Sequence, residues 1–230
     1  MIKLERVALI SQSNYLPWRG YFSLIRQADV YVIFDTAQFT KRDWRNRNRI
    51  RVNDKPHWLT IPVKDGGSQS CAINEIQVEN SNWVESHMNK IEQAYRSFPY
   101  GTDLDFVFDA LSSLKQVRYL SQVNALLLSC IMNSFDIKTE IVNASDFIHS
   151  GSASDKLAAL AQAVNATQYL TAPAARNYLD HAAFRAHSID IRYADYAKLP
   201  IDECGIITGG EYSIIDLIAR VGLNQAAKMF

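Results

Sequence analysis

The chain has 230 residues, of which 48% are hydrophobic and 11% aromatic, enough for one large or two small domains with a sizeable core. Its 24 basic and 24 acidic residues cancel, which excludes a general attraction to nucleic acid or an anionic membrane. The N-terminal apolar run is too short for a secretory signal and no apolar stretch approaches a membrane span, so a cytoplasmic protein is expected. The three cysteines, Cys71, Cys130 and Cys204, fit neither a disulfide framework nor a zinc site.

The first part of the chain alternates between apolar runs and a helical pattern. Residues 6–11 and 30–34 are continuous apolar runs, typical of parallel strands buried on both faces, and residues 18–27 between them have helical periodicity. Such a β-α-β unit is almost always right-handed. It predicts the beginning of a Rossmann-like sheet.

The middle of the chain has a different character. Residues 57–63 and 73–78 are expected to be strands, and they could pair as a hairpin across the turn-rich segment KDGGSQS. Apolar positions then recur at spacings of three and four in residues 82–98, 106–114 and 120–135, which predicts three helices.

The last third returns to alternation. We expect strands at residues 140–142, 168–171 and 189–193, separated by a helix at residues 154–164 and a short one after Pro173. A final helix is expected to begin at Ser213. The chain is therefore expected to be an α/β protein with a Rossmann-like parallel sheet. We expect one domain over residues 1–230, with a helical insertion around residues 80–135.

The first candidate site is the turn after the first strand, residues 12–22, with the sequence QSNYLPWRGYF. It lies at the carboxyl edge of the sheet, where open α/β folds bind ligands. Pro17 can begin a helix whose N-terminus would offer N–H groups to a phosphate, and Gly20 allows a close approach. Trp18 and Tyr21 are three apart and share a face. Alternatively, these aromatic residues are core and Gly20 relieves crowding against the sheet.

The second candidate is the arginine-rich segment after the second strand. Residues 40–51, TKRDWRNRNRIR, contain six cations, five of them arginine, and one acid. Such a density favours an anionic ligand, because the arginine fork suits phosphate and carboxylate, while Trp44 offers a stacking face. The alternatives are a solvated run of charges and a contact with nucleic acid.

Individual polar residues supplement these segments. Asp35 ends the second strand at the edge where Gln12 and Asn14 are expected, and could hold a metal ion, a hydroxyl or an amine, or only cap a loop. Lys64 ends a later strand and could reach the same anion. The five histidines have neither metal-ligand nor triad spacing, and no GxGxxG, P-loop or HExxH motif is present.

Four segments carry a resemblance to a known family. QSNYLPWRGYF, FDTAQFTKRDWRNRNRI, ATQYLTAPAARNYL and YSIIDLIARVG resemble the WbqC-like family of bacterial proteins, over nearly the whole chain. Family members typically carry Gln-Pro-Asn-Tyr-Leu-Pro-Trp, where Ser13 replaces the proline, and Ser-Gly-Pro, where Ala172 replaces the glycine. The resemblance implies a product of a surface-polysaccharide (O-antigen, lipopolysaccharide) gene cluster that attaches glycine to the amine of an amino sugar.

A second similarity is to nucleotidylyltransferase-like folds. Their first β-α turn carries His-x-Gly-His, and a late helix begins with Ser-x-x-x-x-Arg. Residues 18–21, Trp-Arg-Gly-Tyr, have the central glycine but neither histidine, and Ser213 to Arg220 only loosely matches the second motif. The similarity is one of fold.

The family and the residues together give one main hypothesis, a glycyl or other acyl transferase, or ATP-dependent amide ligase, acting on a nucleotide-linked amino sugar. Asp35 would accept the proton of the attacking amine, while Gln12 and Asn14 would orient the acyl carbonyl. The expected substrate-binding residues are Tyr15, Trp18, Gly20, Tyr21, Gln38, Arg42, Asp43, Trp44, Arg45, Asn46, Arg47 and Lys64. No metal site is assigned to the protein's own residues.

Two questions stay open at this point. A donor activated by ATP implies Mg²⁺, whereas a donor activated on transfer RNA needs no metal and could bring RNA to the arginine run. Two further classes use the same residues without catalysis: a module that binds a nucleotide-sugar or glycan, and an RNA-binding protein whose affinity would fall steeply with salt.

Overall fold

The computed structural model describes residues 5–64, 71–199 and 212–230. The chain divides into two compact units. Unit 1 takes in Met1–Gln12, Ser23–Thr36 and Lys138–Leu199, and unit 2 takes in Ser13–Phe22, Ala37–Ile137 and Pro200–Phe230. Among the described residues, no helix has the length and apolar character needed to cross a membrane. Cys71 and Cys130 are free thiols, and Cys204 lies outside the described residues.

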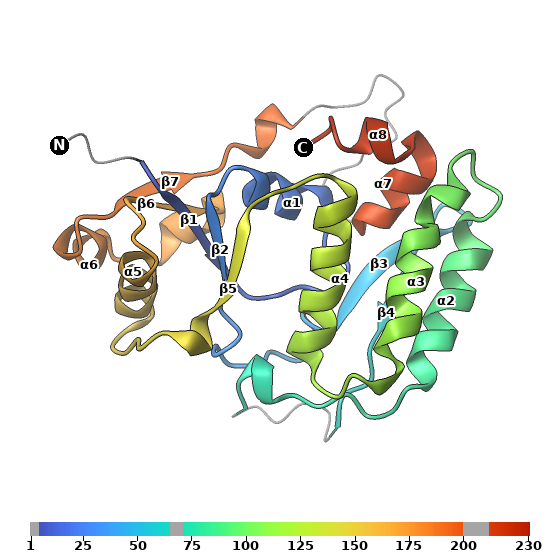
Figure 1. Ribbon diagram of the computed structural model, residues 1–230, viewed down its shortest axis with the longest axis horizontal. Coiled ribbons are helices and arrows are strands. Elements are labelled where there is room, and N and C mark those ends of the chain that lie inside the picture. The colour runs from blue at the N-terminus through green and yellow to red at the C-terminus, as the bar shows by residue number, and fades with distance from the viewer. Residues whose placement is uncertain (1–4, 65–70, 200–211) are drawn as a thin grey trace. The chain divides into compact units, whose positions relative to one another are not determined.

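Unit 1 is built around a parallel sheet of five strands (Figure 1). In spatial order these are β5 (Glu140–Asn143), β2 (Val30–Ile33), β1 (Val7–Ser11), β6 (Gln168–Thr171) and β7 (Asp190–Tyr193). Every neighbouring pair is parallel. Numbered within the sheet, this is the order 3-2-1-4-5 of a Rossmann-like fold, so the α/β prediction is confirmed.

The helices of unit 1 cover a sheet whose central strands are apolar on both faces. All four residues of β2 are buried. Helix α5 (Ala153–Ala163) contacts β1 and β6, and α6 (His181–Ala186) contacts α5 and β7. Helix α5 begins at the N-cap Ser152, whose hydroxyl accepts a hydrogen bond from the backbone N–H of Asp155. Short 3-10 turns complete this unit, at Ala144–Asp146, Pro173–Asn177 and Tyr196–Lys198.

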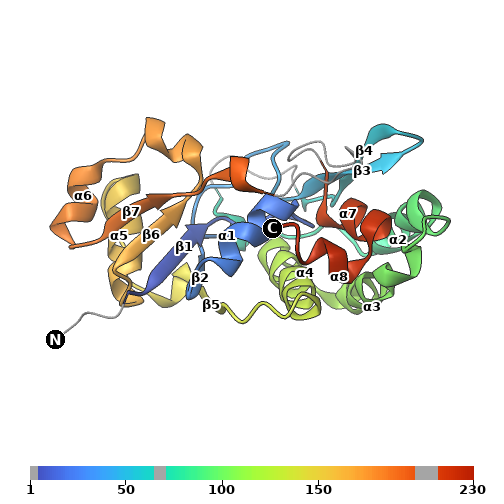
Figure 2. The same cartoon turned by 90° about the horizontal axis from the view of Figure 1, so that it is seen from above.

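Unit 2 combines a β-hairpin with helices. The hairpin is formed by β3 (Arg47–Val52) and β4 (Lys55–Thr60). The helices are α2 (Asn82–Tyr95), α3 (Asp105–Ser113), α4 (Leu120–Ser134), α7 (Ile214–Val221) and α8 (Leu223–Ala226), with 3-10 turns at Ile73–Glu75, Gly101–Leu104 and Leu114–Gln116. Helices α2, α3 and α4 lie side by side (Figure 1), and β3 contacts α2 and α7 (Figure 2). Helix α1 (Arg19–Arg26) begins in unit 2 and ends in unit 1.

The hairpin lies earlier in the chain than the sequence predicts. Strand β4 pairs with β3, and the expected pairing between residues 57–63 and 73–78 is reduced to one isolated bridge, Val63 with Val78. The cause is the two-residue turn Asn53-Asp54, in which both residues have positive φ, +48° and +59°. This is the backbone of a type I′ turn, whose twist matches that of the strands it joins.

The interior of unit 2 holds a buried polar pair, Tyr15 and His87. The hydroxyl of Tyr15 lies 2.8 Å from Nδ1 of His87, and Nε2 of His87 lies 3.2 Å from the carbonyl oxygen of Thr60. Because a carbonyl only accepts, Nε2 carries the hydrogen and Nδ1 accepts from the tyrosine. Burial lowers the pKa of His87 to about 4, and the positive charge of Lys90 adds to this. His87 is therefore neutral in the folded protein near neutral pH.

Replacing His87 with glutamine should reduce the acid sensitivity of the fold. An unfolded chain takes up this proton near pH 6.5 but the folded protein only near 4, so the unfolded state binds more protons between these values. Stability supplied by the neutral ring is present above pH 6.5 and lost as the pH falls, by about 3 kcal/mol in all. Urea unfolding at several pH values measures the difference between the two proteins, and parallel profiles would contradict it.

Candidate functional site

One face of β3 presents arginines at every second position. Arg47, Arg49 and Arg51 are half-buried, while Asn48 and Ile50 between them are buried on the other face. Side chains alternate along a strand, so the three guanidinium groups are directed to the same side of the hairpin. The alternating arginines of the sequence thus occupy one face of a strand.

Two tryptophans cover part of this face. Trp58 on β4 is paired with Arg49 in the register of the hairpin, and its ring centroid lies 5.5 Å from that of Trp44. The guanidinium carbon of Arg47 is 4.0 Å from the centre of the Trp58 ring, and that of Arg49 is 5.2 Å from it. These are cation–π distances. We call Trp44, Arg47, Arg49 and Trp58 the arginine–tryptophan face.

The charges of this face are not neutralised by the part of the chain that the structure describes. Nε of Arg47 and Nε of Arg49 are buried and have no hydrogen-bond partner there. Arg47 donates from Nη2 to the backbone carbonyl of Arg42, which is uncharged. Neither arginine has a carboxylate within ion-pair distance among these residues. Guanidinium groups without a carboxylate partner favour an anionic ligand that can accept from them.

Arg51, two residues further on, has a different environment. Its Nε lies 3.5 Å from Asp216 of α7, and Nε of Arg220 lies 3.4 Å from the same carboxylate. The hydroxyl of Tyr95 donates to Asp216 at 3.0 Å and accepts from the backbone N–H of Arg51. Burial, together with the charge of Asp216, raises the pKa of Tyr95, so the hydroxyl stays protonated. This network fastens β3 to α2 and α7.

Other members of the predicted arginine-rich site have partners that hold the local backbone. Arg45 donates to the side chain of Asn14 and to the carbonyl of Ser13, and lies 3.5 Å from Asp43. Asn46 is buried and donates to the carbonyl of Ile61 at 2.9 Å. These contacts tie the turn after β1 to the segment before the hairpin, both within unit 2. Arg42 is exposed.

The aromatic residues of the first predicted loop are largely interior. Tyr15 is fully buried against His87, and Tyr21 is only 5% exposed. A Cβ on Gly20 would lie 2.2 Å from the indole of Trp18, so the close approach that this glycine permits is made by Trp18 itself. Trp18 is half-buried. The structure gives these four residues packing contacts within the chain.

Two further predicted residues lie apart from the arginine–tryptophan face. Gln38 is exposed and forms an isolated antiparallel bridge with Ala72. Lys64 donates to the side chain of Gln77 at 2.8 Å and lines a cleft that contains none of the hairpin arginines.

The two remaining predicted catalytic residues belong to unit 1. Gln12 comes directly after β1, and Asp35 comes two residues after the end of β2. Because β1 and β2 are adjacent and parallel, both residues lie at the same edge of the sheet. Asp35 is only 3% exposed. The strand order reverses between β1 and β6, so Gln12 and not Asp35 flanks this switch point. Beside Asp35 in the sequence, the hydroxyl of Thr36 lies 3.0 Å from Nε2 of His149. Within the described ranges, no three His, Cys, Asp or Glu side chains gather as metal ligands would.

Sequence reasoning missed three residues that shape this region, namely Arg49, Trp58 and Asp216. Arg49 lies within the arginine-rich segment of residues 40–51, and its alternation with Asn48 and Ile50 is the sequence signal that indicates an exposed strand face. Trp58 lies beside the arginines only because of the register of the hairpin, and Asp216 contacts Arg51 only because α7 packs on β3. No local pattern connects either residue to the arginines.

Comparison with known proteins gives two matches. The model of the WbqC-like protein family matches residues 12–228. The chain is also 35% identical over 221 residues to the uncharacterized protein Rv1507c of Mycobacterium tuberculosis, and the alignment covers 95% of each chain. No solved structure matches. Both matches span residues of both units.

Two substitutions should distinguish the arginines that have a carboxylate partner from those that contact only aromatic rings. Asp216→Asn removes the only charge that the structure places against Arg51 and Arg220 among the described residues, and should lower the free energy of unfolding by about 3 kcal/mol. Arg49→Gln removes only contacts with aromatic rings and should cost less than about 1 kcal/mol. Chemical denaturation measures both, and equal losses would make Arg49 a structural residue.

Proposed function

Because this chain belongs to the WbqC-like protein family, we propose that it is a transferase that acylates the amine of a nucleotide-linked amino sugar, with glycine as the expected acyl group. The observation that carries the proposal is the arginine–tryptophan face. It places two arginines without counter-charges among the described residues beside two indole rings, in a chain whose net charge is zero. A nucleoside diphosphate carries both an anion and a flat ring, and so matches both features.

Each member of the face has a part in binding. Arg47 and Arg49 would donate to the phosphate oxygens, because their forks suit a tetrahedral anion. Trp58 is 37% exposed, which leaves ring surface for a base or for the apolar side of a sugar. The cation–π contacts hold both guanidinium groups before the ligand arrives, so less side-chain freedom is lost on binding.

The acyl transfer would form one bond and break another. The amine nitrogen of the sugar attacks the acyl carbonyl, the amide C–N bond forms, and the bond to the activating group breaks. Asp35 keeps its proposed role as the acceptor of the amine proton, and Gln12 and Asn14 keep theirs in orienting the carbonyl. In this proposal the acyl donor is either activated by ATP with Mg²⁺ or delivered already activated on transfer RNA.

Turnover tests the proposal directly. The protein should convert glycine, ATP with Mg²⁺ and a nucleoside diphosphate amino sugar, or glycyl-transfer RNA and the same sugar, into a glycyl adduct seen by mass spectrometry. Adduct together with release of pyrophosphate or AMP in the first mixture would identify glycine activated by ATP as the donor. Adduct in the second mixture alone would identify glycyl-transfer RNA. Tight binding of the sugar without product from either donor would instead make the protein a binding module.

Substitutions can distinguish residues that bind the nucleotide-sugar from residues that take part in the acyl transfer. Arg47→Gln combined with Arg49→Gln should weaken binding of the nucleotide-sugar by about a hundredfold, since two charge-assisted hydrogen bonds are lost. Asp35→Asn should leave binding within about twofold and reduce turnover by at least about a hundredfold. Arg185→Gln, an exposed arginine on α6, is the matched control. Calorimetry and the adduct assay measure the two effects. Unchanged binding in the double variant would refute the role of the face.

A further inference from the structure

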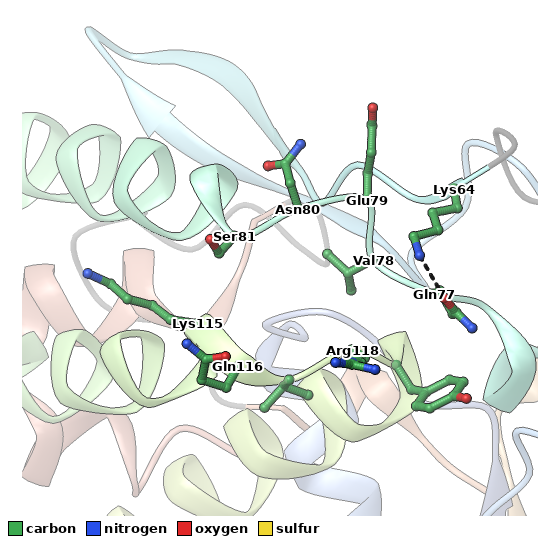
Figure 3. A pocket seen from close by; sticks show the side chains of 11 residues that line it. Lys64, Gln77, Val78, Glu79, Asn80, Ser81, Lys115, Gln116 and Arg118 are labelled. Atoms are coloured by element: carbon green, nitrogen blue, oxygen red, sulfur yellow. Dashed lines mark hydrogen bonds between the residues drawn. The ribbon is translucent and has the colours of Figure 1, made fainter.

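Unit 2 also contains a polar cleft that the proposed reaction does not use. It has a volume of about 340 Å³ and is lined by residues 64, 77–81 and 115–119 (Figure 3). This volume falls within the range of small-molecule sites. We propose that the cleft binds a phosphate-bearing small molecule, independently of the arginine–tryptophan face.

The charge of the lining favours an anion. Three cations, Lys64, Lys115 and Arg118, line the cleft with a single carboxylate, that of Glu79. Figure 3 shows the side chain of Glu79 directed away from the segment that carries Lys115 and Arg118. Because the whole chain has no net charge, this local excess does not follow from a generally basic surface.

The three cations differ in how far their charges are compensated. Arg118 makes no hydrogen bond or ion pair through its side chain with any residue that the structure describes. Lys64 donates to the neutral amide of Gln77 at 2.8 Å, which positions the ammonium group without neutralising it. Lys115 lies 3.0 Å from Glu85, and both side chains are exposed, so this pair is weak and can be exchanged for a ligand. Lys64 and Arg118 thus offer uncompensated positive charges to a ligand, whereas the charge of Lys115 is shared with Glu85.

The walls of the cleft are held in place by the backbone. The N–H of Val78 donates to the carbonyl of Arg118 at 2.8 Å, and the N–H of Lys64 donates to the carbonyl of Gln77 at 2.9 Å. Isolated antiparallel bridges join Val63 to Val78 and Gln77 to Tyr119. These bonds fix the three segments that line the cleft relative to one another, so a ligand has to order the cationic side chains but not the backbone.

Phosphate is the anion that fits this donor set. Lysine ammonium groups act as point charges with donors in several directions, which suits a tetrahedral oxyanion, and Arg118 adds a fork for two oxygens. A planar carboxylate offers only two oxygens to three cations on two sides of the cleft. The remaining polar lining, including Asn80, Ser81 and Gln116, could bind the hydroxyl groups of a sugar phosphate.

The experiment is carried out in the Arg47→Gln, Arg49→Gln protein, so that the arginine–tryptophan face does not contribute. Pyrophosphate, a hexose phosphate and acetate are titrated by calorimetry at moderate salt. We expect one site for each phosphate probe and at least about tenfold weaker binding of acetate. Absence of phosphate binding, or equal affinity for acetate, would overturn the proposal.

Substitutions in the same background locate the site. Lys64→Gln and Arg118→Gln should each weaken binding of the phosphate probe at least about tenfold, since each removes a charged donor. Glu85→Gln should tighten it several-fold by releasing Lys115. Arg185→Gln is again the control, and thermal unfolding should be unchanged in all, because these side chains are exposed. Equal affinity in every variant would refute the cleft as the site. Neither result depends on turnover, so the outcome is separate from that of the proposed transferase.

Discussion

The arrangement of unit 2 depends on the carboxylate of Asp216. It is nearly buried and receives the charges of Arg51 and Arg220 together with the hydroxyl of Tyr95. Leaving two guanidinium groups there without a counter-charge would be costly. Because Asp216 is occupied by Arg51 and Arg220, no charge of this network remains for Arg47 and Arg49. One acid on a distant helix therefore divides a single run of arginines into a structural part and a part open to ligands.

The sheet could be predicted from the sequence because its strands carry their own signal. The strands β1 and β2 are short apolar runs, and the periodicity of α2, α3 and α4 extends over several turns. Strand β3 has no such signal, since three of its six residues are arginine. Its existence depends on the Asn53-Asp54 turn and on the pairing with β4. The short helices α6 and α8 offer too few residues for a period to show.

The candidate site was predictable in its residue types but not in its partners. A dense group of Arg, Asn and Trp indicates that anions and polar groups are bound, and it does so equally when the bound groups belong to the chain itself. Arg45 and Asn46 bind backbone carbonyls and Tyr15 binds His87, whereas Arg47 shares its face with Trp58. Only the strand register and the packing of α7 distinguish these cases, and both arise from residues far away in the sequence.

The course of the chain through the two units has a consequence for biosynthesis. The chain passes from one unit to the other after Gln12, Phe22, Thr36, Ile137 and Leu199, so neither unit is one continuous segment. The backbone N–H of Arg6, just before β1, bonds to the side chain of Thr167, 161 positions later. The central strand of the sheet therefore leaves the ribosome long before the partner on one of its sides exists. We therefore expect this sheet to form late and slowly, and the apolar strands β1 and β2 to need protection from aggregation until it has formed.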